Sequence, residues 1–294
     1  TVKINFPTAG ASGALYAVGA AITNMWSNNV PGVQAASQAS AGGIANLNMV
    51  SDGEAQVSIA ISSNVYQCLN GTDSFKDHPY KDLKAIAGLY MNPNQVVVTA
   101  KSGIQTLADV KGKRFAVASA GSSVYNESNA HFTAAGLKFP DDIQAEYITF
   151  TDAADMLQNG SIDGAWIMSG APASAVTQAL TGGARLVNID DQLVKELKAK
   201  YPWYASYTIK AGTYPNQDRD VRTTAVKMVM FTRGDMPEDV VYNLTKALWE
   251  HIDELGQAQK NLKGLKPEDA VKDIAGVPLH PGAERYYREI GVLK

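Results

Sequence analysis

Cysteine and charge are both scarce in this chain of 294 residues. Cys68 is its one cysteine, so the sequence excludes an intramolecular disulfide and any pair of cysteines at metal-ligand spacing. Charged residues make up 19% of the chain and the formal net charge is −3, without the basic stripe that nucleic-acid binding requires. No run of about 18 apolar residues occurs, so the sequence predicts no membrane-spanning helix. We therefore expect no nucleic-acid partner and no insertion into a membrane.

Motifs for nucleotide binding, metal binding and catalysis are missing as well. The sequence contains neither a P-loop nor a GxGxxG fingerprint, and no GxSxG or SxxK motif surrounds its serines. Its four histidines are His78, His131, His251 and His280. They are far apart and lack a second ligand at metal spacing, so we expect them at the surface or capping helices. The sequence thus predicts no metal, no cofactor and no enzymatic activity, with a transferase on the same fold as the alternative.

Strands and helices alternate along the chain, which indicates an α/β fold. We predict strands at 2–6, 56–61, 147–150, 164–168 and 224–231, and two further strands at 83–89 and 95–99 that leave the first lobe. Residues 207–220 are expected to form the linker that returns to it. The predicted lobes are 1–97 plus 213–294, and 98–212, with a ligand cleft between them.

A strand that runs into a loop of small residues and then into a helix occurs twice. In the first copy, strand 2–6 leads into loop 8–13, and in the second, strand 115–118 leads into loop 119–123. Small side chains leave backbone N–H groups open, and the helix N-terminus adds partial positive charge, so each loop can cradle an anionic group. Each loop alone is also compatible with an ordinary tight turn. Four such loops, after Phe6, Ile61, Ala118 and Met168, favour a ligand site, because ligands bind at the carboxyl ends of strands.

The candidate ligand-binding residues lie in or beside these loops. Tyr16 and Tyr125 are expected in first helical turns, where a phenol can donate to a carboxylate, with core packing as the alternative. Ser122 and Ser123 fit helix N-caps or ligand-binding hydroxyls better than nucleophiles. The whole set comprises Gly10, Ala11, Ser12, Tyr16, Gln38, Ser62, Asn64, Ser119, Gly121, Ser122, Ser123, Tyr125, Gly170 and Ala171.

Short segments along essentially the whole chain carry a family resemblance. Residues 7–16 read PTAGASGALY, and further segments follow at 102–114, 121–122, 153–157, 160, 162–163, 170–172, 200–202, 211–215 and 279–284. In this order they resemble the solute receptors of the TAXI branch of TRAP transporters, whose opening pattern is G-T-G-G-x-G-G-x-Y-Y. These receptors are type II periplasmic binding proteins.

The resemblance implies two lobes, joined by crossing strands, that close on a small organic anion and deliver it to the membrane subunits of a TRAP transporter. Related receptors are associated with glutamate, glutamine and dicarboxylates such as 2-oxoglutarate. We expect a periplasmic monomer. A chain that begins at Thr1, directly at a strand, favours an exported protein after removal of its signal peptide, with a shortened chain as the alternative.

Two positions depart from the family pattern. Ile61-Ser62-Ser63 stands where the family often has Gln-Ser-Asp, and Tyr125 stands where a Glu is common. An acid at either position would pair with an ammonium group of the ligand. The sequence therefore predicts a ligand with a carboxylate and no α-amino group.

Overall fold

The computed structural model describes residues 1–11 and 14–294, which divide into two compact units. Unit 1 comprises residues 1–90 and 227–294, and unit 2 comprises residues 91–226. The chain passes from one unit to the other inside two long strands, β4 (Leu83–Val98) and β10 (Val221–Arg233). The divisions therefore fall at 90/91 and 226/227 rather than at 97/98 and 212/213.

Strand β4 corrects the expectation of two separate strands at 83–89 and 95–99. It is continuous through Pro93, and its ladder with β7 (Gly164–Met168) begins only at Asn94. The N–H that proline lacks is therefore not needed by that ladder. The return to unit 1 likewise runs inside β10, whereas residues 207–220 include part of strand β9 (Ala205–Ile209).

Unit 1 is built on strands β1 (Val2–Pro7), β2 (Val33–Gln38) and β3 (Val57–Ile61), with parts of β4 and β10. β1 pairs in parallel with β2, with Val2 opposite Val33. β3 pairs antiparallel with β10, with Ile61 opposite Met228. The backbone N–H of Gln56 donates to the carbonyl of Asn5 at 3.3 Å, which places β3 beside β1.

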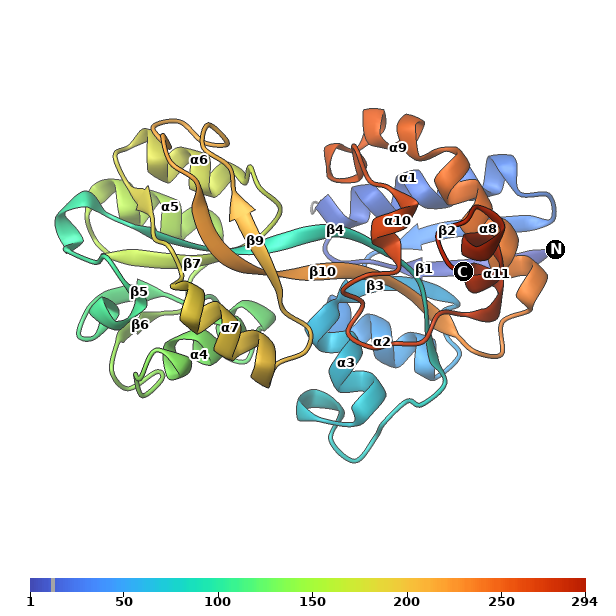
Figure 1. Ribbon diagram of the computed structural model, residues 1–294, viewed down its shortest axis with the longest axis horizontal. Helices are drawn as coiled ribbons and strands as arrows, with labels where there is room; N and C mark the ends of the chain where they lie inside the picture. Colours follow the sequence, from blue (N-terminus) through green and yellow to red (C-terminus); the bar gives the residue numbers. More distant parts are fainter. Residues whose placement is uncertain (12–13) are drawn as a thin grey trace. The chain divides into compact units, whose positions relative to one another are not determined.

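Helices cover both faces of the unit 1 strands (Figure 1). They are α1 (Ala14–Asn29), α2 (Gly43–Ser51), α3 (Ser62–Asn70), α8 (Glu238–Glu250), α9 (Ile252–Ala258), α10 (Pro267–Ala270) and α11 (Pro281–Glu289). Short 3₁₀ turns add η1 (Asp73–Phe75) and η4 (Lys260–Leu262). The fully buried Trp26 of α1 donates its indole N–H to the carbonyl of Leu244 on α8 at 3.0 Å. This contact joins the N-terminal and C-terminal segments of the discontinuous unit.

Unit 2 has three parallel strands, each followed by a helix. Strand β5 (Arg114–Ala116) lies between β6 (Gln144–Glu146) and β7, and pairs in parallel with both. The following helices are α4 (Ser123–Ala134), α5 (Phe150–Asn159) and α6 (Ser174–Thr181). The remaining elements are η2 (Ala100–Ser102), η3 (Leu107–Val110), β8 (Arg185–Leu186) and α7 (Asp191–Lys200).

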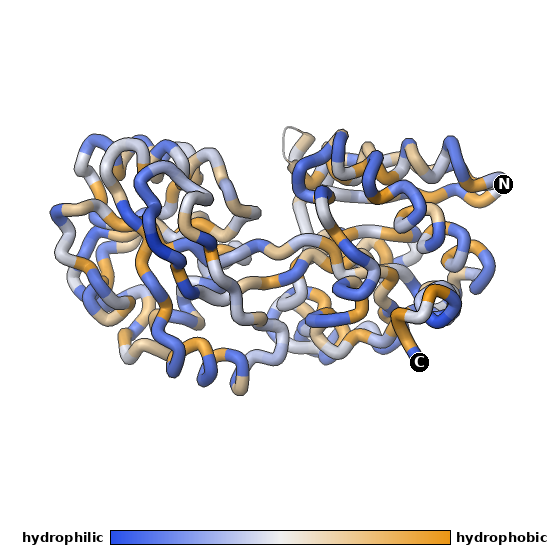
Figure 2. Tube along the Cα trace, turned by 45° about the horizontal axis from the view of Figure 1, so that its top comes forward, coloured by the Kyte–Doolittle hydropathy of each residue, from blue (hydrophilic) through white to orange (hydrophobic). Residues whose placement is uncertain are grey.

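Side chains alternate across the unit 2 sheet, as strand geometry requires. Val96, Phe115 and Trp166 pack on the face covered by α4 and α7. Val97 and Ala165 point the other way, into the core beneath α5 and α6. Figure 2 colours the chain trace by hydropathy, and orange apolar stretches alternate with blue hydrophilic ones along each unit.

The strand predicted at 147–150 is wrong. β6 ends at Glu146, and Phe150 is already the first residue of α5. The side chain of Thr149 accepts a hydrogen bond from the backbone N–H of Asp152 at 3.1 Å and so caps α5. The β-branched and aromatic residues that favour a strand here are overridden by this N-cap.

Candidate functional site

In unit 1, the ends of β1, β2 and β3 lead into helix openings at one end of the strands. The backbone N–H of Asn5 donates to the side-chain oxygen of Gln56 at 2.7 Å, and the hydroxyl of Ser58 donates to the carbonyl of Pro7 at 2.6 Å. Residues 5–7 and 56–58 therefore lie side by side and run in the same direction. α2 begins after Gly42, whose φ of 106° suits glycine, and α3 begins after Ile61. Neither helix has a side-chain N-cap. The first N–H groups of α2 are therefore available to another acceptor.

A buried polar network holds these openings in place. Asn46 is fully buried and donates from its amide to the carbonyls of Thr8 at 2.8 Å and Ile59 at 3.2 Å. The hydroxyl of Ser40 donates to the backbone carbonyl of Thr8, and the hydroxyl of Thr8 donates to the backbone carbonyl of Gln38. The network thus connects the ends of β1, β2 and β3. The sequence did not reveal the role of Asn46, because Thr8 and Ile59 lie far from it along the chain.

The unit 1 residues proposed from the sequence lie around this network. Gly10 and Ala11 are exposed, whereas Ser12 lies outside the described residues. Tyr16 is half-buried in the first turn of α1. The side-chain amide of Gln38 lies 3.9 Å from the sulfur of Met49. Ser62 is buried, and its hydroxyl accepts a hydrogen bond from the backbone N–H of Lys227. The side-chain amide of Asn64 donates to the side-chain oxygen of Gln67.

In unit 2, residues 118–122 form the opening of α4. Ala118 and Gly121 both have positive φ, 61° and 76°, and only the glycine adopts this conformation without strain. The hydroxyl of Ser122 accepts from the N–H of Tyr125 at 3.2 Å, which confirms Ser122 as an N-cap. Ser119 and Gly121 are exposed, and Ser123 is half-buried. Strained backbone such as that at Ala118 often occurs at functional sites, although Ala275 has a similar φ of 57°.

Tyr125 lies beside a second tyrosine at this opening. Its ring centroid is 4.9 Å from that of Phe139 and 6.3 Å from that of Tyr147, which is 50% exposed. The packing alternative for Tyr125 is therefore realised on one side of its ring.

The second opening in unit 2 follows β7, next to β5 in the sheet. Gly170 and Ala171 lie here, so adjacent parallel strands bring them to the same end of the sheet as residues 118–122. α6 begins after Ala173 without a side-chain cap. The N–H of Ala173 donates instead to the phenol oxygen of Tyr214 at 2.8 Å.

A buried acid and a buried histidine lie in the interior beneath the α4 opening. Burial raises the pKa of Glu127 to about 7, although Tyr204 and Asn94 donate hydrogen bonds to its carboxyl group. Burial lowers the pKa of His131 to about 4. His131 accepts at Nε2 from the hydroxyl of Thr224 and donates from Nδ1 to the backbone carbonyl of Glu127, both at 2.7 Å.

His131 corrects the expectation that the histidines lie at the surface or cap helices, and the sequence did not reveal that Glu127 is buried beside it. His131 is fully buried rather than at the surface, whereas His280 is indeed a helix cap, accepting from the N–H of Gly282. The available signal was the spacing of four residues between Glu127 and His131, which puts both on one face of a helix.

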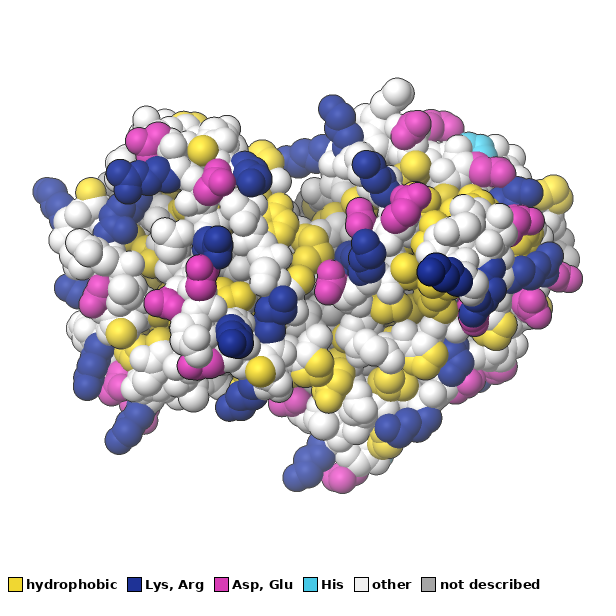
Figure 3. Space-filling view, in the orientation of Figure 1, with side chains coloured by type: hydrophobic (Ala, Val, Ile, Leu, Met, Phe, Trp, Pro, Cys, Tyr) yellow, Lys and Arg dark blue, Asp and Glu magenta, His cyan; other side chains and the backbone are white. Residues whose placement is uncertain are grey.

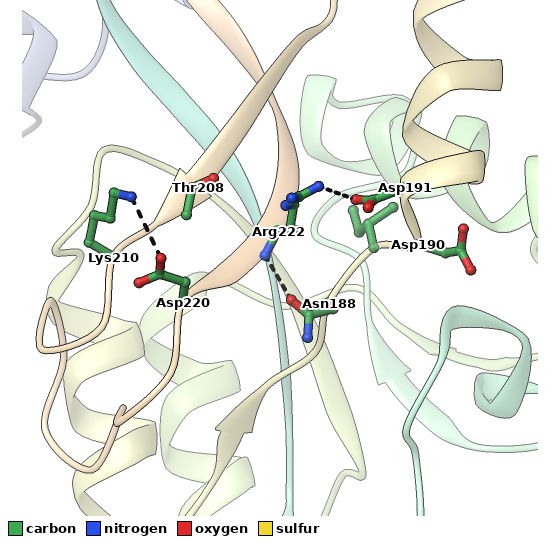
Figure 4. Close-up of a pocket in the computed structure, with 8 residues that line it drawn as sticks. Asn188, Asp190, Asp191, Thr208, Lys210, Asp220 and Arg222 are labelled. Carbon is green, nitrogen blue, oxygen red and sulfur yellow. Dashed lines mark hydrogen bonds and ion pairs between the residues drawn. The ribbon is translucent and has the colours of Figure 1, made fainter.

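A polar surface pocket of unit 2 lies between the start of α7 and strands β9 and β10 (Figure 4). Arg222 pairs with Asp191 at 2.5 Å, and Lys210 pairs with Asp220 at 3.6 Å. Since both cations already face acids, the pocket offers no uncompensated positive charge to an anion. Figure 3 shows the same mixture of basic and acidic side chains over the visible face of the molecule. The helix openings are therefore the better candidates.

Residues 1–11 and 14–294 hold no cluster of three or more histidine, cysteine, aspartate or glutamate side chains that would bind a metal ion. None of the helices in these residues combines the length and the apolar character needed to cross a bilayer.

The fold is similar to that of solved two-lobed α/β periplasmic binding proteins. The aliphatic sulphonate-binding protein SsuA from Escherichia coli is 18% identical, with a TM-score of 0.53, and the match covers 98% of this chain and 82% of SsuA. A TctC solute-binding protein from Polaromonas is 16% identical, with a TM-score of 0.60 and coverage of 96% and 98%. SsuA from Xanthomonas axonopodis pv. citri, solved with MOPS, is 17% identical, with a TM-score of 0.51 and coverage of 98% and 84%.

At these identities the solved structures show the shared fold, and they confirm the two-lobed α/β class expected from the sequence. The family is shown by the sequence itself. Residues 6–291 match the NMT1-like family, and the chain belongs to that family.

Proposed function

We propose that this protein is a periplasmic solute receptor of the TAXI type, which binds a small organic carboxylate and delivers it to the membrane subunits of a TRAP transporter. The observation that carries the proposal is the repeated helix opening at the carboxyl ends of the strands in each unit. α2 and α6 begin without side-chain caps, so their first N–H groups are available to an anionic ligand. The family and the fold support a binding protein of this class.

Each unit contributes one set of ligand groups in this proposal. In unit 1 these are the loop that contains Gly10, Ala11 and Ser12 and the start of α3. In unit 2 they are residues 119–125 and residues 170–171. Backbone N–H groups and serine hydroxyls supply the donors, and Tyr16 and Tyr125 supply phenols.

The charges of these loops favour a carboxylate without an amino group. Residues 8–13, 39–43, 118–123 and 169–173 contain no Asp or Glu, so none of them offers a carboxylate partner to an ammonium group. They contain no Lys or Arg either, so a carboxylate would be held by N–H dipoles and hydroxyls. A keto acid such as 2-oxoglutarate fits this donor set better than L-glutamate.

Thermal unfolding in the presence of 2-oxoglutarate, L-glutamate, succinate, benzoate and an alkanesulfonate tests the proposal. A ligand at 100 times its Kd adds about 2.7 kcal/mol to the free energy of unfolding, which shifts the Tm visibly. We expect a saturable shift with 2-oxoglutarate or succinate and a smaller one with L-glutamate. A larger shift with L-glutamate would show that the amine argument is wrong, and a shift with the sulfonate alone would overturn the carboxylate.

A matched pair of variants tests the site. Ser123→Asp adds an acid to the first turn of α4, where the helix dipole tolerates it but an anionic ligand would be repelled. Gln192→Asp makes the same change in the first turn of α7, away from the proposed loops. We expect the ligand-induced shift to disappear only in Ser123→Asp. Equal shifts in both variants would remove the α4 opening from the site.

A further inference from the structure

Two adjacent amide side chains lie on β4 just after it enters unit 2. Asn94 is 1% exposed and Gln95 is fully buried. Neighbouring residues of a strand point to opposite faces, so Asn94 lies on the α4 side of the sheet and Gln95 on the α6 side. A buried amide needs partners for its donors and its acceptor, and both residues have them.

Gln95 holds the segment between β7 and α6. Its Nε2 donates to the carbonyl of Ser169 at 2.9 Å, and its Oε1 accepts from the phenol of Tyr214. The same phenol oxygen accepts from the N–H of Ala173, the residue before α6. Both ends of residues 169–173 are therefore tied to one side chain of β4.

Asn94 holds α4 in the same way. Its Nδ2 donates to the carboxyl group of Glu127 on α4 and to the hydroxyl of Thr224 on β10, both at 3.0 Å. Its Oδ1 accepts from the indole N–H of Trp166 on β7 at 2.9 Å. One amide thus joins α4, β7 and both strands through which the chain passes between the units.

We propose that Asn94 and Gln95 are positioning residues, which fix the helix α4 and the opening of α6 to the strand that connects unit 2 with unit 1. The proposal rests on the proposed function in one respect, namely that the residues before α4 and α6 bind the ligand. Its structural content is independent of the ligand: removing either amide should loosen one opening and leave the rest of unit 2 as it was.

Backbone hydrogen exchange of the unliganded protein tests this, because it reports local opening segment by segment. In Gln95→Met we expect exchange in α6 to accelerate about tenfold, with α5 unchanged, since a lost buried hydrogen bond has about this effect on an opening equilibrium. In Asn94→Leu we expect the acceleration in α4. The matched control is Ser102→Ala, which removes a buried hydroxyl that bonds to Thr99 and Ile104. It should leave α4 and α6 unchanged.

A second variant separates positioning from a general loss of stability. In Gln95→Glu, a protonated carboxyl group can still donate to Ser169 and accept from Tyr214, whereas an ionised one can only accept. We expect exchange in α6 to match the wild type at pH 5 and to approach the Gln95→Met value as the pH rises, each rate taken relative to the wild type at that pH. This arm is decisive even if Asn94→Leu does not fold.

Uniform acceleration over all of unit 2, unchanged exchange in α6, or a Gln95→Glu variant without pH dependence would each overturn the positioning role. The proposed function is judged separately, by the thermal shift of the wild-type protein with added acids. A failure of one experiment therefore leaves the other result intact.

Discussion

Glu127 and His131 should make opposite contributions to the pH dependence of stability. The pKa of Glu127 rises from 4.5 to about 7 on folding, because burial favours the neutral acid. Its contribution is complete below pH 4.5 and is lost as the pH rises through about 7. The pKa of His131 falls from 6.5 to about 4, because burial favours the neutral ring. Its contribution is complete above pH 6.5 and is lost as the pH falls through about 4.

The two contributions are similar in size. A pKa change from 4.5 to about 7 corresponds to about 3 kcal/mol in the free energy of unfolding, as does a change from 6.5 to about 4. Between pH 4.5 and 6.5 each changes by about 1.4 kcal/mol per pH unit, in opposite directions. In the wild-type protein they therefore cancel over this range, and single substitutions should expose them.

Urea unfolding from pH 4 to 7.5, followed by tryptophan fluorescence, measures the effect. The free energy of the wild type minus that of Glu127→Gln should fall by about 3 kcal/mol as the pH rises from 4.5 to 7. The wild type minus His131→Asn should rise by about the same amount between pH 4 and 6.5. For the double variant the difference should be flat between pH 4.5 and 6.5. Curves for both single variants that run parallel to the wild type would refute the reasoning.

Three further predictions concern unit 1. Lys227 is buried and donates from Nζ to the carbonyls of Asp269 at 2.5 Å and Lys272 at 2.8 Å, so Lys227→Met should lower the free energy of unfolding by about 2 kcal/mol in urea titrations. An unchanged urea midpoint would show that these two hydrogen bonds do not stabilise the protein. Gly19→Ala should cost about 1–3 kcal/mol in the same assay, since its Cβ would overlap the methyl group of Thr8; a stable variant would mean that α1 shifts freely. Burial raises the pKa of Cys68 to about 12, so a disulfide reagent at pH 8 should modify this thiol slowly in the native protein and quickly in urea. Equal rates would show that the thiol is exposed.

Local features of the chain could be predicted from its sequence. Ser122 is an N-cap because the residues that follow it open a helix, and this depends on three neighbouring residues. The α/β class follows from the alternation of strands and helices in the same way. Ligand roles for Gly121 and the other loop residues remain predictions, because the fold alone does not test them.

Features that depend on distant partners could not be predicted. The burial of His131 depends on Thr224, 93 residues further along, and the role of Asn94 depends on that same residue, 130 residues away. The continuity of β4 through Pro93 depends on where its ladder with β7 begins. In each case the two interacting residues or strands lie far apart in the sequence, so neither segment alone predicts the contact.

The order of the two units along the chain also bears on how the protein folds during synthesis. Unit 2 is one continuous stretch, residues 91–226, so all its strands and helices are available before the C-terminal segment is made. Unit 1 cannot be completed until β10, α8 and α11 emerge, because contacts such as that between Ser62 and Lys227 span 165 residues. Long-range pairings of this kind form slowly, and domains tend to fold as units. We therefore expect the N-terminal 90 residues to lack some of their strand and helix partners while unit 2 folds. A chain that ends before residue 227 would contain all of unit 2 and only the N-terminal part of unit 1.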